Sequence, residues 1–279
     1  MLSIVIPTYN RASLIDATLD SVLATLRSDD EVIVRDNRST DGTPDVVRQR
    51  VAADARIKLI EAASNEGPVR NWLQAIDAAR GEFTLLLFSD DVLLGSSFAA
   101  LRTQFETSDH HVAFGSALIG PDIASALPEF VLQQGTCTLP ARAYLRYMIR
   151  RLGSVPVSPA AYLFRTQALR QAMVKAMTDL GQDRDALATG AGIDLLIVAH
   201  AVMSAGQCLY RAEPHVFFRQ HDGSMSTARE AVVQRLYRES RVLLSRHHQS
   251  AAHAVATRCA YALTWHVRQL RRAIASRIC

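Results

Sequence analysis

Two adjacent carboxylates, Asp90 and Asp91, follow a short apolar segment at 83–88 and have no basic residue beside them. A short apolar run bounded by polar residues is typical of a buried strand in a parallel sheet. Open α/β sheets bind ligands outside the carboxyl ends of their strands, where paired carboxylates suit a hard divalent cation held together with substrate phosphates. The pair therefore indicates a metal-dependent enzyme with a phosphorylated substrate. The structural alternative is a helix N-terminal cap.

Polar segments also follow three earlier apolar segments that we expect to be strands. Residues 7–11 follow the first, 36–42 the second, and 65–67 the third, with Arg70 a little further on. Because the carboxyl ends of parallel strands lie at one edge of a sheet, these segments should converge on Asp90 and Asp91. Each segment alone has a structural explanation, such as a strand end at Tyr9 or an Asx turn at Asp36. Their convergence is more specific than any one of them.

The elements that would position these residues alternate between strand and helix. The sequence predicts strands at 3–7, 31–35, 57–60 and 83–88, and helices at 13–26, 44–52 and 69–79. Ser13 is the expected cap of the first helix, and Pro44 opens the second. This alternation predicts right-handed βαβ units in an α/β fold with a mostly parallel, doubly wound sheet flanked by helices.

The pattern is less regular beyond residue 96. Helices are expected at 97–107, 141–152, 166–179 and 194–205, and a strand at 111–116. Residues 209–219 fit a late strand pair or a sheet edge, whereas 120–140 fit no single element. Two C-terminal helices, at 229–247 and 253–278, are expected to close the chain.

Length and composition fit one large α/β domain, or a core domain with a helical addition. The chain has 279 residues, of which 49% are hydrophobic and 21% charged. No apolar run reaches the ~18 residues that a membrane span needs. The first residues lack a basic leader, so we expect no secretory signal. The four cysteines are scattered without metal-ligand spacing, which favours a reduced, cytoplasmic setting.

The net charge of +4 is distributed unevenly, and the sequence pI is about 9.0. Arginines crowd residues 229–277, where only Glu230 and Glu239 oppose them. Such a segment could meet an anionic membrane surface or nucleic acid. A solvated helix face, packing on the core and a dimer contact are the alternatives.

The order of the polar segments closely resembles the family 2 glycosyltransferases, which have the type A nucleotide-sugar-binding fold. The matching segments are 3–11, 36–43, 65–71 and 79–82, the last ahead of Ser89-Asp90-Asp91. The resemblance is strong over 1–100 and looser to about residue 227. It implies a type A glycosyltransferase domain at 1–227, in which 1–100 bind the nucleotide sugar and 101–227 the acceptor. Residues 228–279 would be a helical basic extension.

The resemblance also implies a role for each matching residue. Asp36 would hydrogen-bond the base, Arg70 would sit near the base or phosphates, and Asp90 would face the ribose or sugar. Asp91 would coordinate Mn²⁺ or Mg²⁺ on the diphosphate, where a cation stabilises the charge of the leaving group. The remaining residues assigned to the nucleotide-sugar site are Pro7, Thr8, Tyr9, Arg11 and Asn65.

A segment at 218–226 resembles the Arg-X-His-X-X-Ser-X-Ser segment of many members. The resemblance implies that Arg219 and Ser224 contact the donor phosphates and that His221 reaches the metal or diphosphate. A neutral imidazole can ligate a metal, whereas a charged one would pair with phosphate. A purely structural His221 is the alternative.

An inverting transferase needs a general base that removes a proton from the acceptor hydroxyl. The family places an aspartate, often after a glutamate, at the start of a helix well beyond the metal motif. Asp194 fits that place, although Ile193 stands where the glutamate often stands. Asp183 and Asp185 are nearby competitors, and a helix cap is the structural alternative.

The leading hypothesis is metal-dependent, inverting transfer from a nucleoside-diphosphate sugar of the UDP, dTDP or GDP type. The acceptor would be a hydroxyl of a glycan or a lipid-linked molecule in surface polysaccharide synthesis, in the cytoplasm and with peripheral contact to the inner face of an anionic membrane. Two alternatives stay open. One is a glycosyltransferase that acts on hydroxylated nucleic-acid bases. The basic segment lacks interleaved aromatic residues, which argues against nucleic-acid binding. The other is a catalytically silent scaffold that binds nucleotide sugars, against which all the key aspartates are intact.

Overall fold

The computed structural model describes residues 1–150, 155–221 and 230–248. Its first elements are β1 (Leu2–Thr8), α1 (Ile15–Leu23), β2 (Glu31–Asp36), α2 (Thr43–Ala53), β3 (Ile57–Glu61), α3 (Pro68–Ala78) and β4 (Phe83–Leu86). The strands pair in parallel in the order β3-β2-β1-β4. The alternation and the parallel pairing predicted for this part of the chain are confirmed.

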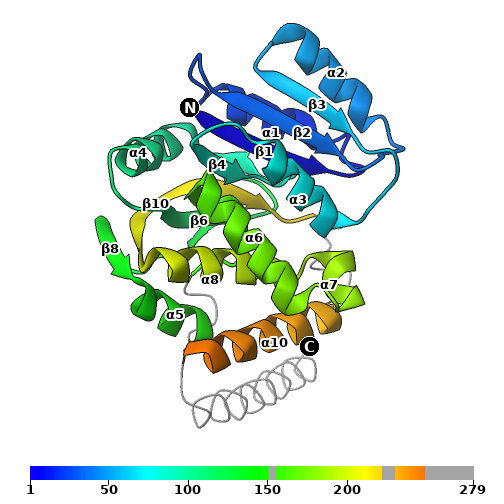
Figure 1. Ribbon diagram of the computed structural model, residues 1–279. Helices are drawn as coiled ribbons and strands as arrows, with labels where there is room; N and C mark the ends of the chain where they lie inside the picture. Colours follow the sequence, from blue (N-terminus) through cyan, green and yellow to red (C-terminus); the bar gives the residue numbers. More distant parts are fainter. Residues whose placement is uncertain (151–154, 222–229, 249–279) are drawn as a thin grey trace, which may run out of the picture.

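The sheet becomes mixed beyond β4. The elements that follow are β5 (Val92–Leu93), α4 (Gly95–Glu106), β6 (Val112–Gly120), β7 (Leu127–Glu129), β8 (Thr136–Pro140), α5 (Ala141–Arg150), η1 (Pro159–Ala161), β9 (Tyr162–Arg165), α6 (Thr166–Leu180), α7 (Arg184–Thr189), α8 (Ile193–Ala205), β10 (Gln207–Arg219) and α10 (Glu230–His248). β9 is antiparallel to β4 and β6, whereas β6 and β10 are parallel. The sheet order is β3-β2-β1-β4-β9-β6-β10-β5, with β7 beside β6 and β8 beside β10. Figure 1 labels β1–β4, β6, β8 and β10 of this sheet.

Several elements differ from the sequence predictions. Residues 209–219, predicted as a strand pair or a sheet edge, belong to one long strand, β10, that lies inside the sheet between β6 and β5. α1 begins after Leu14, so Ser13 does not cap it. The sequence did not show β5, β7, β8, β9 and α7. β5 and β7 have two and three residues, β7 and β8 contain no buried residue, and β9 and α7 are short elements outside the regular βαβ alternation that identified the equally short β2, β3 and β4. The predicted helix at 253–278 lies outside the described residues.

The parallel strands and one helix form the centre of the core. Every residue of β1, β2 and β4 is buried, as expected for parallel strands that are covered on both faces. Figure 1 shows α3 and α6 lying across the near face of the sheet. α8 is buried throughout 193–202 because α5, α6 and α10 all pack on it. It therefore has no polar face, as its apolar sequence requires.

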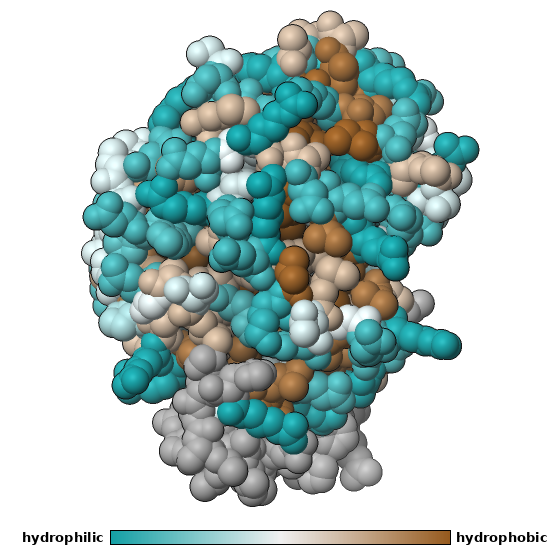
Figure 2. All heavy atoms as spheres, viewed as in Figure 1, coloured by the Kyte–Doolittle hydropathy of each residue, from teal (hydrophilic) through white to brown (hydrophobic). Residues whose placement is uncertain are grey.

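The surface seen in Figure 2 is mostly hydrophilic. Apolar residues gather over α2 and β3, and again where α3, α6 and α7 meet. Within the part of the chain that the structure describes, no helix combines the length and hydropathy that crossing a bilayer demands.

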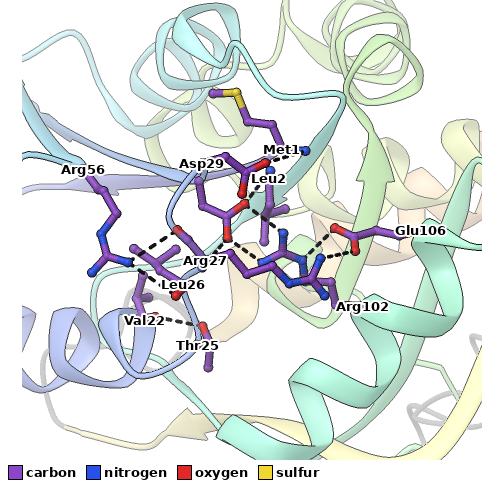
Figure 3. A network of polar contacts seen from close by, with 11 residues as sticks. Met1, Leu2, Val22, Thr25, Leu26, Arg27, Asp29, Arg56, Arg102 and Glu106 are labelled. Atoms are coloured by element: carbon purple, nitrogen blue, oxygen red, sulfur yellow. Dashed lines mark hydrogen bonds and ion pairs between the residues drawn. The ribbon is translucent and has the colours of Figure 1, made fainter.

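A buried ion pair anchors the start of β1, at the end of the strand that lies away from the polar segments. Arg102 of α4 donates to both carboxylate oxygens of Asp30, at 2.6 and 2.8 Å, and Asp30 also accepts from the backbone N–H of Leu2 and of Arg27. Burial opposes the charge on Asp30, but these hydrogen bonds outweigh it and hold the pKa of the carboxyl below its usual value. Figure 3 shows Leu2, Arg27 and Arg102 in this network, which fixes β1 against α4.

Candidate active site

Hydrogen bonds connect the loops after β1 and β2 at the carboxyl edge of the sheet. Thr8 and Asp36 are paired in register at the ends of the two strands. Beyond them, the N–H of Asn10 donates to Ser39 Oγ at 2.8 Å, and the N–H of Arg11 donates to a threonine hydroxyl at the start of α2 at 2.8 Å. Asn10 has a positive φ of 51°, which turns the chain sharply after the strand. The convergence predicted for these two segments is therefore present.

Asp36 is almost fully buried, and its carboxylate is engaged by its own loop. It accepts from the N–H of Ser39 at 2.9 Å and from the Ser39 hydroxyl at 2.5 Å. This is the turn expected from the structural alternative. The predicted contact between Asp36 and a nucleobase stays a prediction.

The third polar segment joins the same edge through Asn37. The Asn37 side chain donates to Asn65 Oδ1 at 2.9 Å and accepts from the N–H of Glu66 at 3.0 Å. Asn65 also accepts from the N–H of Gly67 and is exposed, as is Arg70 in the first turn of α3. The structure thus brings Asn65 and Arg70 to the loops that follow β1 and β2.

Two buried polar atoms at this edge have no hydrogen-bond partner within the described residues. They are Thr8 Oγ1 and Asn71 Oδ1. The other end of the Asn71 amide donates to the carbonyl oxygens of Thr8 and Arg35, which fixes the side chain between β1 and β2. Unsatisfied buried polar groups are rare in folded proteins and mark places where water or a ligand supplies the partner. Pro7 is buried beside Thr8, whereas Tyr9 is 41% exposed.

The two carboxylates occupy different environments after β4. Asp90 is partly exposed and lies between His221 and Arg11, with Oδ2 at 2.9 Å from His221 Nε2 and 3.7 Å from Arg11 Nε. Asp91 is buried, and the backbone of Arg219 hydrogen-bonds to it. α4 begins only after Leu94, so the interpretation of the pair as a helix cap is wrong.

Asp91 carries an uncompensated charge when it is ionised. Burial and the neighbouring charge of Asp90 raise the pKa of Asp91 well above its usual value, against the smaller effect of Arg219. A divalent cation would remove that penalty, and carboxylate oxygens are the ligands that Mg²⁺ and Mn²⁺ prefer. Nowhere in the described residues do three or more His, Cys, Asp or Glu side chains gather around one point as ligands. The donor set therefore fits a cation that takes its remaining ligands from water and a bound diphosphate.

Asp194 lies in the first turn of α8, next to the positive end of the helix. Gly192 is the N-cap, so Asp194 is not the capping residue. Asp194 Oδ1 accepts from the N–H of Leu195 at 2.7 Å, and Oδ2 accepts from the hydroxyl of Tyr237 at 2.6 Å. Burial raises the pKa of Asp194 to about 7, although these hydrogen bonds oppose the shift. Such a carboxyl is poised for proton transfer near neutral pH.

The two competing aspartates are occupied elsewhere. Asp183 caps α7 and pairs with Arg235 at 3.0 Å, and that arginine holds the pKa of Asp183 below its usual value. Asp185 pairs with the same guanidinium at 2.8 Å. Ion-paired carboxylates of this kind are weak bases. Asp194 is therefore the best candidate base of the three.

An aromatic side chain connects the acidic turn to the loop before α8. The Trp72 ring lies 5.2 Å from the Phe88 ring, measured between centroids, and Phe88 comes just before Ser89 and Asp90. The other side of Trp72 contacts Gly190 so closely that a methyl group there would overlap with the ring. Gly190 has a φ of 73°, and only three residues separate it from Asp194. Trp72 thus brings the acidic turn and the loop before α8 to one region.

Sequence reasoning missed Trp72 and Tyr237, and it placed Asn71 in a matching segment without giving it a role. Trp72 belongs to α3, where its apolar period gave no functional signal. Tyr237 lies on α10, in the segment that was interpreted through its arginines alone. Ser224, a predicted phosphate ligand, lies outside the described residues.

Comparisons with solved structures show a shared fold. TarS 1–349 of S. aureus, solved in complex with UDP-GlcNAc, has a similar fold with a TM-score of 0.66 at 20% identity, covering 91% of this chain and 69% of that one. The mannosyltransferase PcManGT of Pyrobaculum calidifontis, solved with GDP-Man and Mn²⁺, has a TM-score of 0.55 at 17% identity, covering 96% of this chain and 84% of that one. The fold is therefore the type A fold of glycosyltransferases.

The sequence comparisons give the family. Residues 3–124 match the family model "Glycosyl transferase family 2". The GalNAc(5)-diNAcBac-PP-undecaprenol beta-1,3-glucosyltransferase of Campylobacter jejuni is 35% identical over 119 residues, which cover 42% of this chain and 38% of that protein. Residues 3–124 are therefore similar to the family 2 glycosyltransferases, as the motifs predicted, and the match spans well under half of that relative. The predicted domain division at residue 227 stays a prediction.

Proposed function

We propose that this protein is a metal-dependent, inverting glycosyltransferase. It moves a sugar from a nucleoside-diphosphate sugar to a hydroxyl of a glycan or lipid-linked acceptor in surface polysaccharide synthesis. The observation that carries the proposal is the meeting of the Asp90–Asp91 turn with the loop of Asp194 across Trp72. The proposal places an anionic site for a cation and a buried base on either side of one reaction centre.

The donor half of the site would hold the nucleotide at the carboxyl edge of β1 and β2. Thr8 Oγ1 and Asn71 Oδ1 offer unused hydrogen-bonding capacity there, and exposed Tyr9, Asn65 and Arg70 surround the edge. Arg11, beside Asp90, offers a charge to the diphosphate. The names of the two solved structures favour a UDP or GDP donor, and the dTDP type stays possible by the resemblance.

Asp91 would hold the cation, with His221 as its predicted second ligand. The cation supplies charge stabilisation to the diphosphate as it leaves. His221 hydrogen-bonds Asp90 rather than Asp91 in this structure. It is therefore close enough to the acidic turn to serve either as a ligand or as a partner of the phosphates.

Asp194 would act on the acceptor side. Its carboxylate takes the proton of the acceptor hydroxyl as the acceptor oxygen bonds to the anomeric carbon. The bond from that carbon to the phosphate oxygen breaks, and its electron pair leaves with the nucleoside diphosphate. Attack from the face opposite the leaving group inverts the anomeric configuration.

The cytoplasmic location and the peripheral membrane contact remain parts of the proposal. The undecaprenol-linked substrate in the name of the Campylobacter relative supports a lipid-linked acceptor. The described part of the basic segment gives less support to membrane contact, because Arg235 and Arg241 of α10 bond to the core. A dimer contact stays a prediction, and the chemistry of the site gives no reason to expect nucleic acid.

A thermal-shift experiment tests donor and metal binding together. Saturating UDP, dTDP, GDP, UDP-GlcNAc or GDP-mannose should stabilise the protein by about 2.7 kcal/mol at a hundredfold excess over Kd, which raises Tm by a few degrees. We expect at least one to do so only with Mn²⁺ present, and Asp91→Asn to abolish the Mn²⁺-dependent part. The exposed variant Asp77→Asn is the control. If no compound shifts the Tm of the folded protein, the transferase proposal fails.

A further inference from the structure

α10 packs against the loop that leads into α8 at very short range. Gly192, with a φ of 81°, faces α10, and a methyl group there would lie 2.5 Å from Ser240 Oγ and 3.2 Å from the carbonyl oxygen of Leu236. Only glycine allows both the backbone angle and this approach. α10 therefore packs tightly against the loop that leads to Asp194.

Polar contacts fix α10 on both sides of this point. Arg235 bridges Asp183 and Asp185 at 3.0 and 2.8 Å, which ties α10 to α7. Arg241 donates through Nε to the carbonyl oxygen of Met148 in α5 at 3.0 Å, and its guanidinium lies 5.7 Å from the centre of the Tyr237 ring. Tyr237 thus sits between two anchored turns of α10.

Within the described residues, the Tyr237 hydroxyl donates to Asp194 Oδ2 at 2.6 Å. Burial and the nearby charge of Asp194 raise the pKa of Tyr237 well above its usual value, so the hydroxyl keeps its proton. With Oδ1 held by the N–H of Leu195, both oxygens of the carboxylate have a fixed donor, and the backbone of Gly192 gives the group a further hydrogen bond. A carboxylate can accept about four hydrogen bonds, so Asp194 can still accept one from an incoming acceptor hydroxyl.

We propose that Tyr237 is a positioning residue for the transfer reaction, which orients the Asp194 carboxylate and stabilises its ionised form from α10. The inference rests on the proposed role of Asp194 as base. It makes α10, which lies beyond the residues of the family match, a part of the active site.

The charged groups around Asp194 determine the pH dependence. On α10, Tyr237 and Arg241 favour the ionised carboxylate. On α7, Asp183 and Asp185 are paired with Arg235, and His200 of α8 is paired with Asp179 of α6, which also holds Lys175. Loss of the Tyr237 hydroxyl therefore leaves Asp194 with one fewer stabilising group and no new partner.

The test is the pH profile of nucleoside-diphosphate release from UDP-GlcNAc or GDP-mannose, with Mn²⁺, in wild type and Tyr237→Phe. A lost hydrogen bond to a charged group raises the pKa of Asp194 by about one unit. The acid limb should move up by about one pH unit, with a rate about tenfold lower on that limb. Tyr210→Phe, which removes a hydroxyl that bonds to the backbone N–H of Leu132, is the matched control and should leave the profile unchanged.

The outcomes separate the two proposals. An unshifted Tyr237→Phe profile, with Asp194→Asn inactive, overturns the role of Tyr237 and leaves the base assignment intact. Full activity of Asp194→Asn overturns the base assignment and the inference with it. If Tyr237→Phe does not fold, 3,5-difluorotyrosine at position 237 keeps the packing and strengthens the donor, so the acid limb must move down; an unmoved limb again overturns the role of Tyr237.

Discussion

Asp194 owes its raised pKa chiefly to burial, and the hydrogen bonds of Tyr237 and Leu195 only moderate it. Burial and the charge of Asp90 likewise raise the pKa of Asp91, whereas Asp90 itself is partly exposed beside His221 and Arg11. Burial and partners, rather than residue type, give each of these carboxylates a different environment.

The raised pKa of Asp194 predicts a stability cost at neutral and basic pH. The folded state favours the protonated form of Asp194 more than the unfolded state does. The contribution of Asp194 to the free energy of unfolding is therefore fully present below pH 3.8 and is lost as pH rises through about 7. Asp194→Asn removes the charge and keeps the shape. We expect its stability relative to wild type to be greater at pH 8 than at pH 5, by about 2–3 kcal/mol. Urea unfolding at the two pH values measures the difference, and an equal ΔΔG at both would refute the assigned environment.

The sequence could supply Asp90, Asp91 and Asp194 because family motifs preserve their order along the chain. It could not supply Tyr237 or Trp72, because each acts across a contact with a residue far away in sequence. The contact of Trp72 with Gly190 depends on how α3 and α7 pack, and that of Tyr237 depends on how α10 meets α8. Neither packing leaves a periodic trace in the chain.

Like the residues of the site, only some of the helices and strands that carry it can be predicted from the sequence. The parallel strands and their helices were predictable because apolar runs and helical spacing extend over enough residues. α7 is six residues long and is held by its Asp183 cap and by Arg235, and β9 is a four-residue strand. Such elements are specified by their neighbours more than by their own sequences.

The loop between α7 and α8 depends on two glycines, and Gly190→Ala tests its contact with Trp72. The added methyl group meets both a positive φ and the Trp72 ring, so we expect a loss of about 2 kcal/mol and a lower transfer rate. Gly206→Ala is the matched control, because Gly206 also ends a helix at a φ of 77° but has open space around it. Chemical denaturation compares the two. Equal losses would show that Trp72 does not constrain the loop.

At the scale of the molecule, the site joins two parts of the chain. The donor edge comes from β1, β2 and β4, within the residues that match the family, whereas the candidate base comes from α8 with support from α10. The buried Asp30–Arg102 pair stabilises the opposite end of β1, away from the chemistry. This arrangement separates the residues that hold the sheet together from those that we expect to act on the sugar.

The most direct test of the account is the rate of nucleoside-diphosphate release from UDP-GlcNAc and GDP-mannose, with Mn²⁺, in four folded proteins. These are wild type, Asp91→Asn, Asp194→Asn and Asp185→Asn. Loss of a general base lowers a rate by about 10²–10⁴-fold, so we expect Asp194→Asn to fall at least a hundredfold. Asp91→Asn should fall as well, whereas Asp185→Asn, which alters only an ion pair with Arg235, should stay close to wild type. A wild-type rate in Asp194→Asn, or a loss confined to Asp185→Asn, would contradict the account.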